Sequence, residues 1–295
     1  MPELPDIAVY CESIERELAG ATLRKILLPS VFVLRTVEPA VGAFEGRRLI
    51  HAAYLGKRVV LEFEGGLFAV IHLMIAGRFK WFPPGNKVPM SKIVLARFEF
   101  DRGTLALTEA GTKRRASLHL LRGRDALAAH DPGGIDPLTC TLAEFTARLQ
   151  HENHTLKRAL TDPHSFSGIG NSYSDEILHR AKLSPLALSQ KLPASEVARL
   201  RDATREIMDE WLQRLRAESA GKFPEKVTAF RAEMAVHGKF KQPCPVCGSP
   251  VQRIVYAENE CNYCPVCQTG GKLLADRALS RLLKSNWPKN IDELS

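Results

Sequence analysis

The chain has 295 residues, a formal net charge of +8, and contains 45% hydrophobic and 25% charged residues. This length accommodates two domains and a small accessory module. No run approaches the roughly 18 apolar residues of a membrane-spanning helix, and no basic segment followed by an apolar one opens the chain, so we expect no membrane partner and no secretion. The basic excess suits a polyanionic partner, but charge alone is equally typical of an ordinary basic protein.

The segment after Pro5 has a helical period, which is carried by Ile7, Tyr10, Cys11, Ile14 and Leu18. Gly20 is the expected end of this helix. From about residue 23 to residue 121, short alternating runs such as Val59, Leu61 and Phe63 are joined by tight turns. This pattern predicts a β-sandwich or barrel with a helix at its front edge.

Proline and glycine breakers at residues 131–137 separate this region from a helical one. Thr141 and Glu144 form a capping box before one predicted helix, and Asn153 is expected to cap a second, short one. Residues 168–171, Gly-Ile-Gly-Asn, make a tight turn that opens a third helix. A long amphipathic helix is predicted from about residue 195 to residue 220.

Seven cysteines are an odd number, which argues against a disulfide framework and favours a reducing compartment. Four of them form two CxxC pairs, Cys244 with Cys247 and Cys264 with Cys267, with sixteen residues between the pairs. Two redox motifs are the alternative, but a redox CxxC normally occurs once, beside a βαβ unit. The spacing therefore predicts one structural Zn2+ with four thiolate ligands and no open coordination position. Cys11 and Cys140 stand alone and are expected to be buried.

The N-terminus reads Met1-Pro2-Glu3-Leu4-Pro5-Asp6. A proline in second position generally lets the initiator Met be removed, which exposes a secondary amine. With a pKa of about 7.7–8.0, an α-amino group is partly neutral at physiological pH and can attack an electrophilic carbon to form an iminium. Glu3 is an adjacent carboxylate that can shuttle a proton. By itself this start is a weak signal, because most such chains have no catalytic use for it.

Four features occur together in order: the N-terminal motif, Lys57 after a turn in the β-rich region, the helix start at 168–171 and the two CxxC pairs. In this combination the chain resembles the formamidopyrimidine-DNA glycosylase / endonuclease VIII family from residue 1 to about residue 268. The resemblance implies an α+β multidomain fold. It consists of an N-terminal catalytic β-sandwich domain fronted by a helix (1–130), a helix–two-turns–helix DNA-binding domain (131–238) and a four-cysteine zinc finger, or zinc ribbon (239–268). A basic helical extension (269–295) goes beyond the usual family end.

The resemblance also implies an activity: excision of oxidised or damaged bases from double-stranded DNA, with cleavage of the abasic site by β/δ-elimination. Pro2 would be the nucleophile that attacks C1′, and Glu3 its acid/base partner. Lys57 would contact a phosphate at the lesion and assist catalysis, and Asn171 and Lys157 would bind backbone phosphates. A protein of this kind is expected to act as a monomer in the cytoplasm, associated with the nucleoid, or in the nucleus.

The chain departs from the family at the residues that fill the space left by a flipped nucleotide. Ile75 stands where formamidopyrimidine glycosylases carry a methionine in a His-Leu-Gly-Met-Ser-Gly stretch. Arg114 and Arg115 lie in the loop that usually supplies an arginine and a phenylalanine, but the phenylalanine is missing. The zinc-finger arginine of the family is Asn259 here, and the lesion-capping loop, within residues 221–230, is short. We therefore do not expect strong 8-oxoguanine activity.

Two other functions compete with that of a glycosylase and abasic-site lyase. One is a catalytically weak module that binds bent or damaged DNA, which the altered void-filling residues and Asn259 favour. The other is a zinc-ribbon transcription or protein-interaction factor with no preference for lesions. The motifs do not select the excised base, because ring-opened purines and oxidised pyrimidines are both compatible with them.

Overall fold

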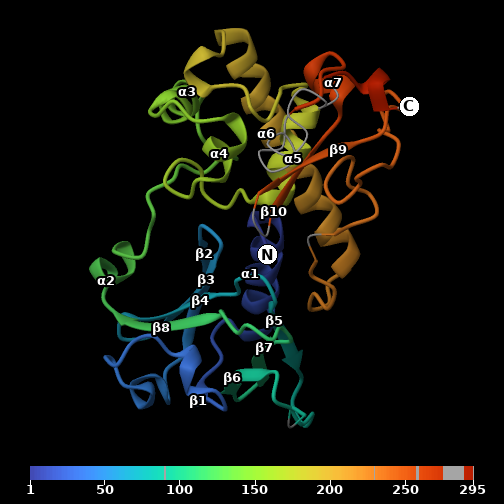
Figure 1. Cartoon of the computed structure of the whole chain (residues 1–295). Helices are drawn as coiled ribbons and strands as arrows, with labels where there is room; N and C mark the ends of the chain where they lie inside the picture. Colours follow the sequence, from blue (N-terminus) through green and yellow to red (C-terminus); the bar gives the residue numbers. More distant parts are fainter. Residues whose placement is uncertain (90, 229, 257–258, 275–288, 295) are drawn as a thin grey trace. The chain divides into compact units, whose positions relative to one another are not determined.

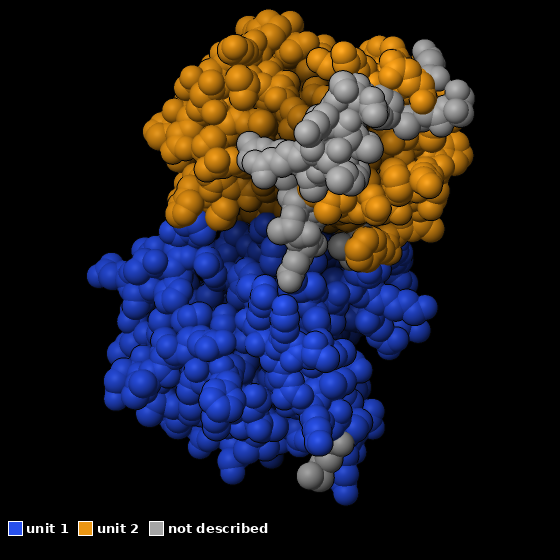
Figure 2. Space-filling model, viewed as in Figure 1, with its two compact units in different colours: residues 1–132, 211–228 blue, residues 133–210, 229–295 orange. Residues whose placement is uncertain are grey.

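The computed structural model describes the whole chain except residues 90, 229, 257–258, 275–288 and 295. The chain forms two compact units (Figure 2). Unit 1 comprises residues 1–132 and 211–228, and unit 2 comprises residues 133–210 and 229–295. The long helix α6 (Ala194–Ser219) contributes its first part to unit 2 and its last part to unit 1.

Unit 1 is a β-sandwich with a helix, α1 (Leu4–Leu18), at its start (Figure 1). One antiparallel sheet has the order β1-β6-β7-β5, formed by Leu23–Leu27, Val94–Phe100, Gly103–Glu109 and Gly77–Phe82. The other has the order β2-β3-β4-β8, formed by Leu49–Leu55, Arg58–Phe63, Leu67–His72 and Ser117–Arg122. Unit 1 also contains two 3-10 turns, η1 (Val31–Val33) and η2 (Val41–Phe44), the short helix α2 (Arg124–Ala128) and the last part of α6.

The core of unit 1 fills the space between α1 and the inward faces of both sheets. Ile7, Ile14 and Leu18 form the apolar face of α1, and Leu61 and Phe98 come from the two sheets; all five are fully buried. Because successive strand residues point to opposite faces, the alternating runs place every second apolar side chain in this core. The predicted sandwich fronted by a helix is confirmed.

Unit 2 is helical and ends in a small hairpin. Its helices include α3 (Leu142–Gln150), α4 (Leu156–Thr161), α5 (Asn171–Arg180) and the first part of α6, with a 3-10 turn, η3 (Ser189–Lys191). The hairpin consists of β9 (Gln252–Tyr256) and β10 (Asn259–Tyr263), followed by α7 (Pro265–Thr269) and η5 (Ile291–Leu294).

One of the two predicted helix caps of unit 2 is confirmed and the other is wrong. Thr141 caps α3 by accepting a hydrogen bond from the Glu144 amide at 3.2 Å, and the Glu144 carboxylate accepts one from the Thr141 amide at 2.8 Å. The predicted N-cap of α4 is wrong by two residues, since the N-cap residue is Thr155 and not Asn153. The helix predicted within 269–295 falls mostly on residues 275–288, outside the described part of the chain.

Candidate active site and metal centre

The start of α1 buries two acidic side chains beside the chain terminus. Glu3 is the N-cap residue, and the Asp6 carboxylate accepts a hydrogen bond from the Glu3 amide at 3.0 Å. Glu3 and Asp6 are 2% and 4% exposed, and Pro2 is also buried. Carboxylates at a helix N-terminus interact favourably with the helix dipole, which offsets part of the cost of their burial.

Lys57 lies in the two-residue turn between β2 and β3, after Gly56. The register pairs Leu55 with Arg58, and Gly56 has a φ of 60°, which glycine adopts without strain. Burial lowers the pKa of the half-buried Lys57 ammonium, and the nearby Glu3 carboxylate opposes this shift. The tight turn thus places Lys57 within electrostatic reach of the start of α1.

The terminal amine lies among these charged groups. Burial lowers the pKa of the Met1 ammonium below its ordinary value of 8.0. Glu3 and Asp6 act to raise this pKa, whereas the cations Arg78 and Lys57 act to lower it further. We call Glu3, Asp6, Lys57 and Arg78 the N-terminal cluster. Among these residues, the sequence motifs had singled out Glu3 and Lys57 but neither Asp6 nor Arg78.

Arg78 holds the loop between β4 and β5. Its Nη1 donates to the carbonyls of Ile75 and Gly77, at 3.1 and 2.6 Å, and its Nε donates to the carbonyl of Val227 at 2.6 Å. A Cβ at Gly77 would overlap the Leu73 carbonyl oxygen, so only glycine fits there. Ile75 is 58% exposed in this loop, which leaves its side chain available for the predicted insertion into DNA.

Met74 has a φ of 53°, in the left-handed region that favours glycine. It occupies the position at which the family stretch has its first glycine. The Met74 amide donates to Nδ1 of His72 at 3.1 Å, which stabilises the unusual turn. Burial lowers the pKa of His72 to about 4, and Arg58, Lys57 and His119 act in the same direction. His72 is therefore neutral at physiological pH.

Arg58 and His119 lie near His72 on the outer face of the second sheet, and His130 contacts both of them. The strand register places Arg58 opposite His72 and His119 opposite Val70, on the same face. The His119 and His130 rings lie 4.8 Å apart, and Arg58 donates to the His130 carbonyl at 2.8 Å. Burial lowers the pKa of both rings, and Arg58 acts in the same direction. Sequence patterns did not reveal this group, because only strand pairing brings it together.

The loop after β7 carries the predicted basic contacts. The buried Glu109 carboxylate accepts hydrogen bonds from the amides of Arg115 and Ala116, at 3.0–3.1 Å. The side chains of Arg114 and Arg115 remain exposed. A Cβ at Gly111 would lie 3.3 Å from that of Ala76, so this loop lies against the loop that holds Ile75. The two loops that are predicted to fill the space left by a flipped nucleotide are therefore neighbours.

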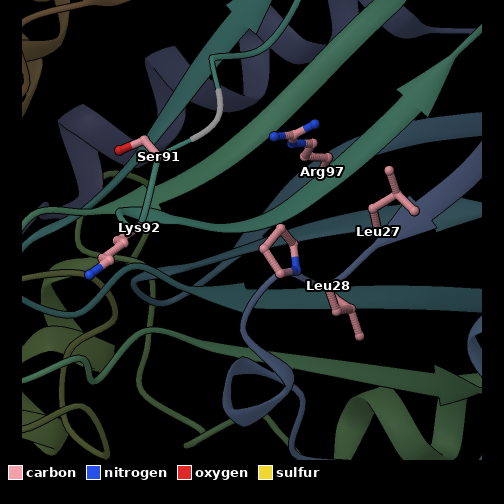
Figure 3. Close-up of a pocket in the computed structure, with 6 residues that line it drawn as sticks. Leu27, Leu28, Ser91, Lys92 and Arg97 are labelled. Carbon is pink, nitrogen blue, oxygen red and sulfur yellow. The ribbon is translucent and has the colours of Figure 1, made fainter.

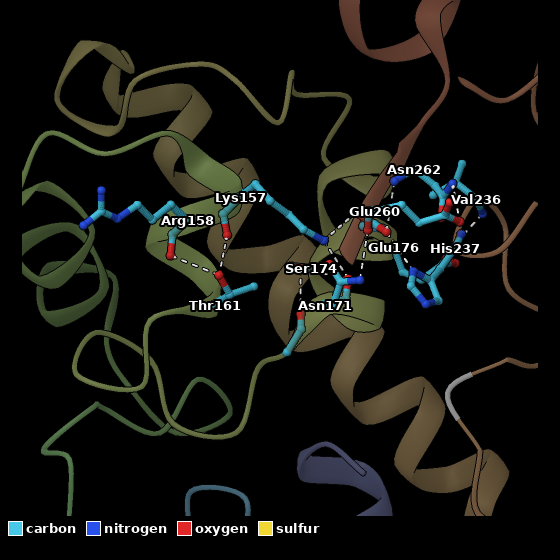
Figure 4. A network of polar contacts seen from close by, with 12 residues as sticks. Lys157, Arg158, Thr161, Asn171, Ser174, Glu176, Val236, His237, Glu260 and Asn262 are labelled. Atoms are coloured by element: carbon cyan, nitrogen blue, oxygen red, sulfur yellow. Dashed lines mark hydrogen bonds and ion pairs between the residues drawn. The ribbon is translucent and has the colours of Figure 1, made fainter. Parts of the chain in front are cut away.

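In unit 2, the N-terminus of α5 is tied to α4 and β10 (Figure 4). Lys157 Nζ donates to the Asn171 carbonyl and to Asp175 Oδ1, both at 2.6 Å. The Asn171 side chain donates to the Glu260 carbonyl at 2.9 Å. Lys157 thus has a positioning contact inside the protein, and phosphate binding by Lys157 and Asn171 stays a prediction.

Asp175 is the centre of this network. It is fully buried, and its Oδ2 lies 2.8 Å from His237 Nδ1 and 3.1 Å from the Asn262 amide, which donates to it. The adjacent Glu176 accepts hydrogen bonds from three backbone amides, of Ala235, Val236 and His237, at 2.7–2.9 Å. Burial raises the pKa of Glu176, and the three amides oppose this shift. No sequence motif pointed to either carboxylate.

The four predicted metal ligands come together beside the hairpin. The sulfur atoms of Cys244, Cys247, Cys264 and Cys267 all lie within 4.8 Å of one another. The Cys247–Cys264 and Cys244–Cys267 sulfur distances are 3.4 and 3.9 Å. Tetrahedral zinc with Zn–S bonds of about 2.3 Å requires sulfur separations of about 3.8 Å, so the cluster fits a metal ion of this kind.

Electrostatics also favours a cation at this cluster. Burial raises the pKa of Cys264 to about 11, so four adjacent thiolates need a positive charge between them. Cys264 caps α7, and its sulfur accepts a hydrogen bond from the Cys267 amide at 3.4 Å. Cys261 is buried but does not belong to the metal-binding group, and Cys11 and Cys140 are buried as predicted.

A pocket of about 660 Å³ lies elsewhere in unit 1, beside β1 and β6 (Figure 3). It is lined by Leu27, Leu28, Pro29, Ser91, Lys92 and Arg97. None of the predicted catalytic or DNA-binding residues belongs to it. Among the helices in the described ranges, none is long and apolar enough to cross a membrane.

Two family models match the chain. The formamidopyrimidine-DNA glycosylase N-terminal domain matches residues 1–117, and the formamidopyrimidine-DNA glycosylase H2TH domain matches residues 134–220. The formamidopyrimidine-DNA glycosylase of Thermus thermophilus is 30% identical over 281 residues, which cover 92% of this chain and 100% of the relative. An uncharacterised formamidopyrimidine-DNA glycosylase-like protein of Mycobacterium tuberculosis is 38% identical over 151 residues, covering 51% of this chain and 94% of that protein.

Solved structures share the fold. A complex of Lactococcus lactis Fpg with DNA that contains an abasic site aligns with a TM-score of 0.79 at 22% identity, over 90% of this chain and 99% of that one. The MutM (Fpg) protein of Thermus thermophilus aligns with a TM-score of 0.73 at 28% identity, over 90% of this chain and 98% of that one. The predicted α+β architecture is therefore confirmed by matches that cover nearly the whole chain.

Proposed function

This chain belongs to the formamidopyrimidine-DNA glycosylase family of DNA-repair enzymes, and from that premise we propose that it excises damaged bases from double-stranded DNA and cleaves the abasic site through a Schiff base on Pro2. The observation that carries the proposal is the N-terminal cluster. Its two carboxylates and two cations all lie within electrostatic reach of the amine at the start of the chain.

The proposed reaction starts at the amine of Pro2 after Met1 has been removed, because the nitrogen of Pro2 is an amide while Met1 precedes it. Burial lowers the pKa of the Met1 amine at this end of the chain, and the Glu3 carboxylate opposes the shift. A lowered pKa of the Pro2 amine at the same place would favour its neutral, nucleophilic form. The amine lone pair attacks C1′, the bond from C1′ to the base breaks, and the base leaves with a proton. The bond between C1′ and the sugar ring oxygen then breaks, which opens the ring and gives the iminium.

Glu3 supplies the proton transfers. Its carboxyl group is buried beside Pro2, so it can protonate the sugar ring oxygen as the ring opens. In the lyase step, the Glu3 carboxylate takes a proton from C2′ as the 3′ phosphate departs, and a second elimination, in which C4′ loses a proton to water, releases the 5′ phosphate. Lys57 lies on the β2–β3 turn, where its ammonium can bind the phosphate at the lesion.

DNA binding involves both units in this proposal. Asn171 at the start of α5 and Lys157 beside it would hold a backbone phosphate. Ile75, Arg114 and Arg115, on neighbouring loops of unit 1, would occupy the space left by the flipped nucleotide. An isoleucine wedge without the accompanying phenylalanine supports a lesion preference other than 8-oxoguanine. The domain division at residues 130, 238 and 268 and a monomeric state are part of the same proposal.

We assign Zn2+ to the four cysteines as a structural ion. Four thiolates fill a tetrahedral coordination sphere, which leaves no position for water or substrate. The ion would hold β9, β10 and α7 together and supply no chemistry to the reaction. Elemental analysis of the purified chain should find one zinc per molecule.

Borohydride trapping tests the Schiff base. The chain, with a Pro2 N-terminus verified by mass spectrometry, is incubated with an abasic-site duplex and borohydride, and a covalent protein–DNA adduct is expected. A matched chain whose Pro2 amine is acetylated should bind the duplex but give no adduct. If the Pro2 chain binds without forming an adduct or cutting the strand, the lyase proposal is wrong. A panel of duplexes with single lesions then identifies the excised base.

The second candidate function is recognition of damaged DNA without turnover. Ile75 in the wedge loop and Asn259 in place of the family's zinc-finger arginine favour it. It predicts tight binding to a duplex with an abasic site and no strand cleavage, so any multiple turnover excludes it.

A further inference from the structure

His179 lies in the last turn of α5 and faces the metal-binding cysteines. Its Nε2 is 3.3 Å from the sulfur of Cys244, and the two residues are 6% and 2% exposed. The helical pattern that predicted α5 used Ile177 and Leu178 and gave no role to this histidine. The contact joins a helix of the DNA-binding region to a ligand of the metal centre.

The chemistry of the sulfur decides which atom is the donor. A thiolate that binds a metal has no proton, so the hydrogen atom of this contact must be on Nε2 of the imidazole. Four thiolates and one divalent cation together carry a net charge of −2, which is costly in a buried site unless N–H donors surround the sulfurs. The Cys267 amide is one such donor. It donates to the sulfur of Cys264, the other cysteine of the second CxxC pair.

We propose that His179 is a positioning residue that donates a hydrogen bond from Nε2 to the metal-bound thiolate of Cys244 and thereby fixes α5 to the metal centre. This inference rests on the zinc assigned above. The same helix is held by the hairpin at its other end, where the Asn171 side chain donates to the Glu260 carbonyl of β10 at 2.9 Å.

A second contact beside His179 strengthens the link. Gln268 of α7 accepts a hydrogen bond from the Cys264 amide at 2.8 Å and donates to the Leu183 carbonyl at 2.9 Å, just after α5. Helix α5 is therefore connected to the two CxxC pairs at its C-terminal end and to β10 at its N-terminal end. Metal loading should for this reason influence how well Asn171 is placed to bind a phosphate.

The competing explanation is that His179 only fills space in the core. A phenylalanine or glutamine should then replace it with no effect on the metal. If it donates to the thiolate, the two replacements differ, because glutamine keeps an N–H donor and phenylalanine does not. The optical spectrum of a cobalt-loaded site reports this directly, since a hydrogen bond to the sulfur changes the energy of the thiolate-to-cobalt charge transfer.

The experiment compares the full-length chain with His179→Phe, His179→Gln and a control, His154→Gln, in which the histidine pairs with Glu152 away from the cysteines. Each is loaded with Co2+, its spectrum is recorded, and metal release to a chromogenic chelator is timed. We expect His179→Phe to shift the charge-transfer band and release metal about tenfold faster. His179→Gln should restore most of the wild-type behaviour, and the control should match the wild type.

An NMR measurement needs no variant that must fold. In the cadmium-loaded wild type, scalar coupling between the His179 Nε2 proton and NMR-active cadmium is expected across the hydrogen bond, and its absence overturns the proposal. Equal spectra and release rates within twofold for His179→Phe and the wild type would also overturn it. A chain that binds no metal would refute the zinc assignment as well, whereas unchanged metal binding in the variants would refute only the role of His179.

Discussion

In unit 2 the carboxylates of Asp175 and Glu176 are buried among donors from α4, the segment 235–237 and β10. At the N-terminal cluster and on the adjoining sheet of unit 1, the groups are basic instead: the terminal amine, Lys57 and His72 are all at least partly buried. The first arrangement satisfies charged groups and fixes a structure. The second lowers the pKa of the terminal amine, Lys57 and His72, because burial penalises the charged form of a basic group.

The difference separates groups that hold the fold from groups suited to chemistry. Perturbed basic groups in one region are typical of functional sites, while a fully hydrogen-bonded carboxylate network is typical of structural support. Substitutions at the N-terminal cluster should therefore change activity more than stability, and substitutions in the carboxylate network of unit 2 should do the reverse.

Glu3→Gln should have the largest effect. If Glu3 is the acid/base group, the rate of base excision falls by about 100- to 10,000-fold, because the amide cannot transfer a proton. Single-turnover excision on a duplex with one lesion measures this, and the melting temperature should change little. Glu17→Gln on the same helix is the control. An excision rate within threefold of the wild type would remove Glu3 from the mechanism.

Asp175→Asn should chiefly affect stability. The substitution removes the carboxylate that pairs with the Lys157 ammonium and lies 2.8 Å from His237 Nδ1, which leaves the half-buried Lys157 without its ionic partner. We expect a loss of about 3–5 kcal/mol in the free energy of unfolding, measured by denaturant titration. Asp202→Asn, at an exposed ion pair on α6, should cost no more than about 1 kcal/mol. Equal costs at the two sites would contradict a structural role for the network.

His72 should make the stability of unit 1 depend on pH. Its pKa in the folded chain is about 4, below the ordinary value of 6.5, so the unfolded chain takes up the proton first as the pH falls. The contribution is complete above pH 6.5 and is lost between pH 6.5 and pH 4. We expect a loss of about 2 kcal/mol over this range, discounted for the partial exposure of the ring.

Unfolding titrations of the wild type and His72→Gln across this pH range measure the effect. The variant should lose most of the pH dependence, whereas His51→Gln, which replaces an exposed histidine on β2, should retain it. A variant as pH-sensitive as the wild type would show that other groups control the acid stability of unit 1.

Met74→Gly should have the smallest effect. A non-glycine residue at a φ of 53° destabilises the folded chain by about 1–2 kcal/mol. Glycine removes this strain, but its greater conformational freedom in the unfolded chain offsets part of the gain in stability. The variant should therefore be more stable by about 1 kcal/mol or less, as measured by its melting temperature. The control is Arg102→Gly, because Arg102 does not have a positive φ. This variant should be less stable than the wild type.

Much of the architecture could be predicted from local patterns. The helical period of residues 7–18 predicted α1, the capping box predicted α3, and the CxxC spacing predicted the four-sulfur cluster. The resemblance named Pro2, Glu3 and Lys57, and the structure places Glu3 and Lys57 within electrostatic reach of the chain start. The roles of these residues stay predictions until the excision and trapping experiments are done.

The sequence by itself determined the class of fold and the four cysteines that come together as a possible metal site, because helical period, strand alternation and CxxC spacing act over a few neighbouring residues. Only the tertiary structure decided the rest. Arg58 meets His72 through the register of β3 and β4, and Asp175 meets Asn262 through the packing of α5 on β10. His179 meets Cys244 across 65 residues of chain. Such pairs depend on how distant segments pack, which no local pattern encodes.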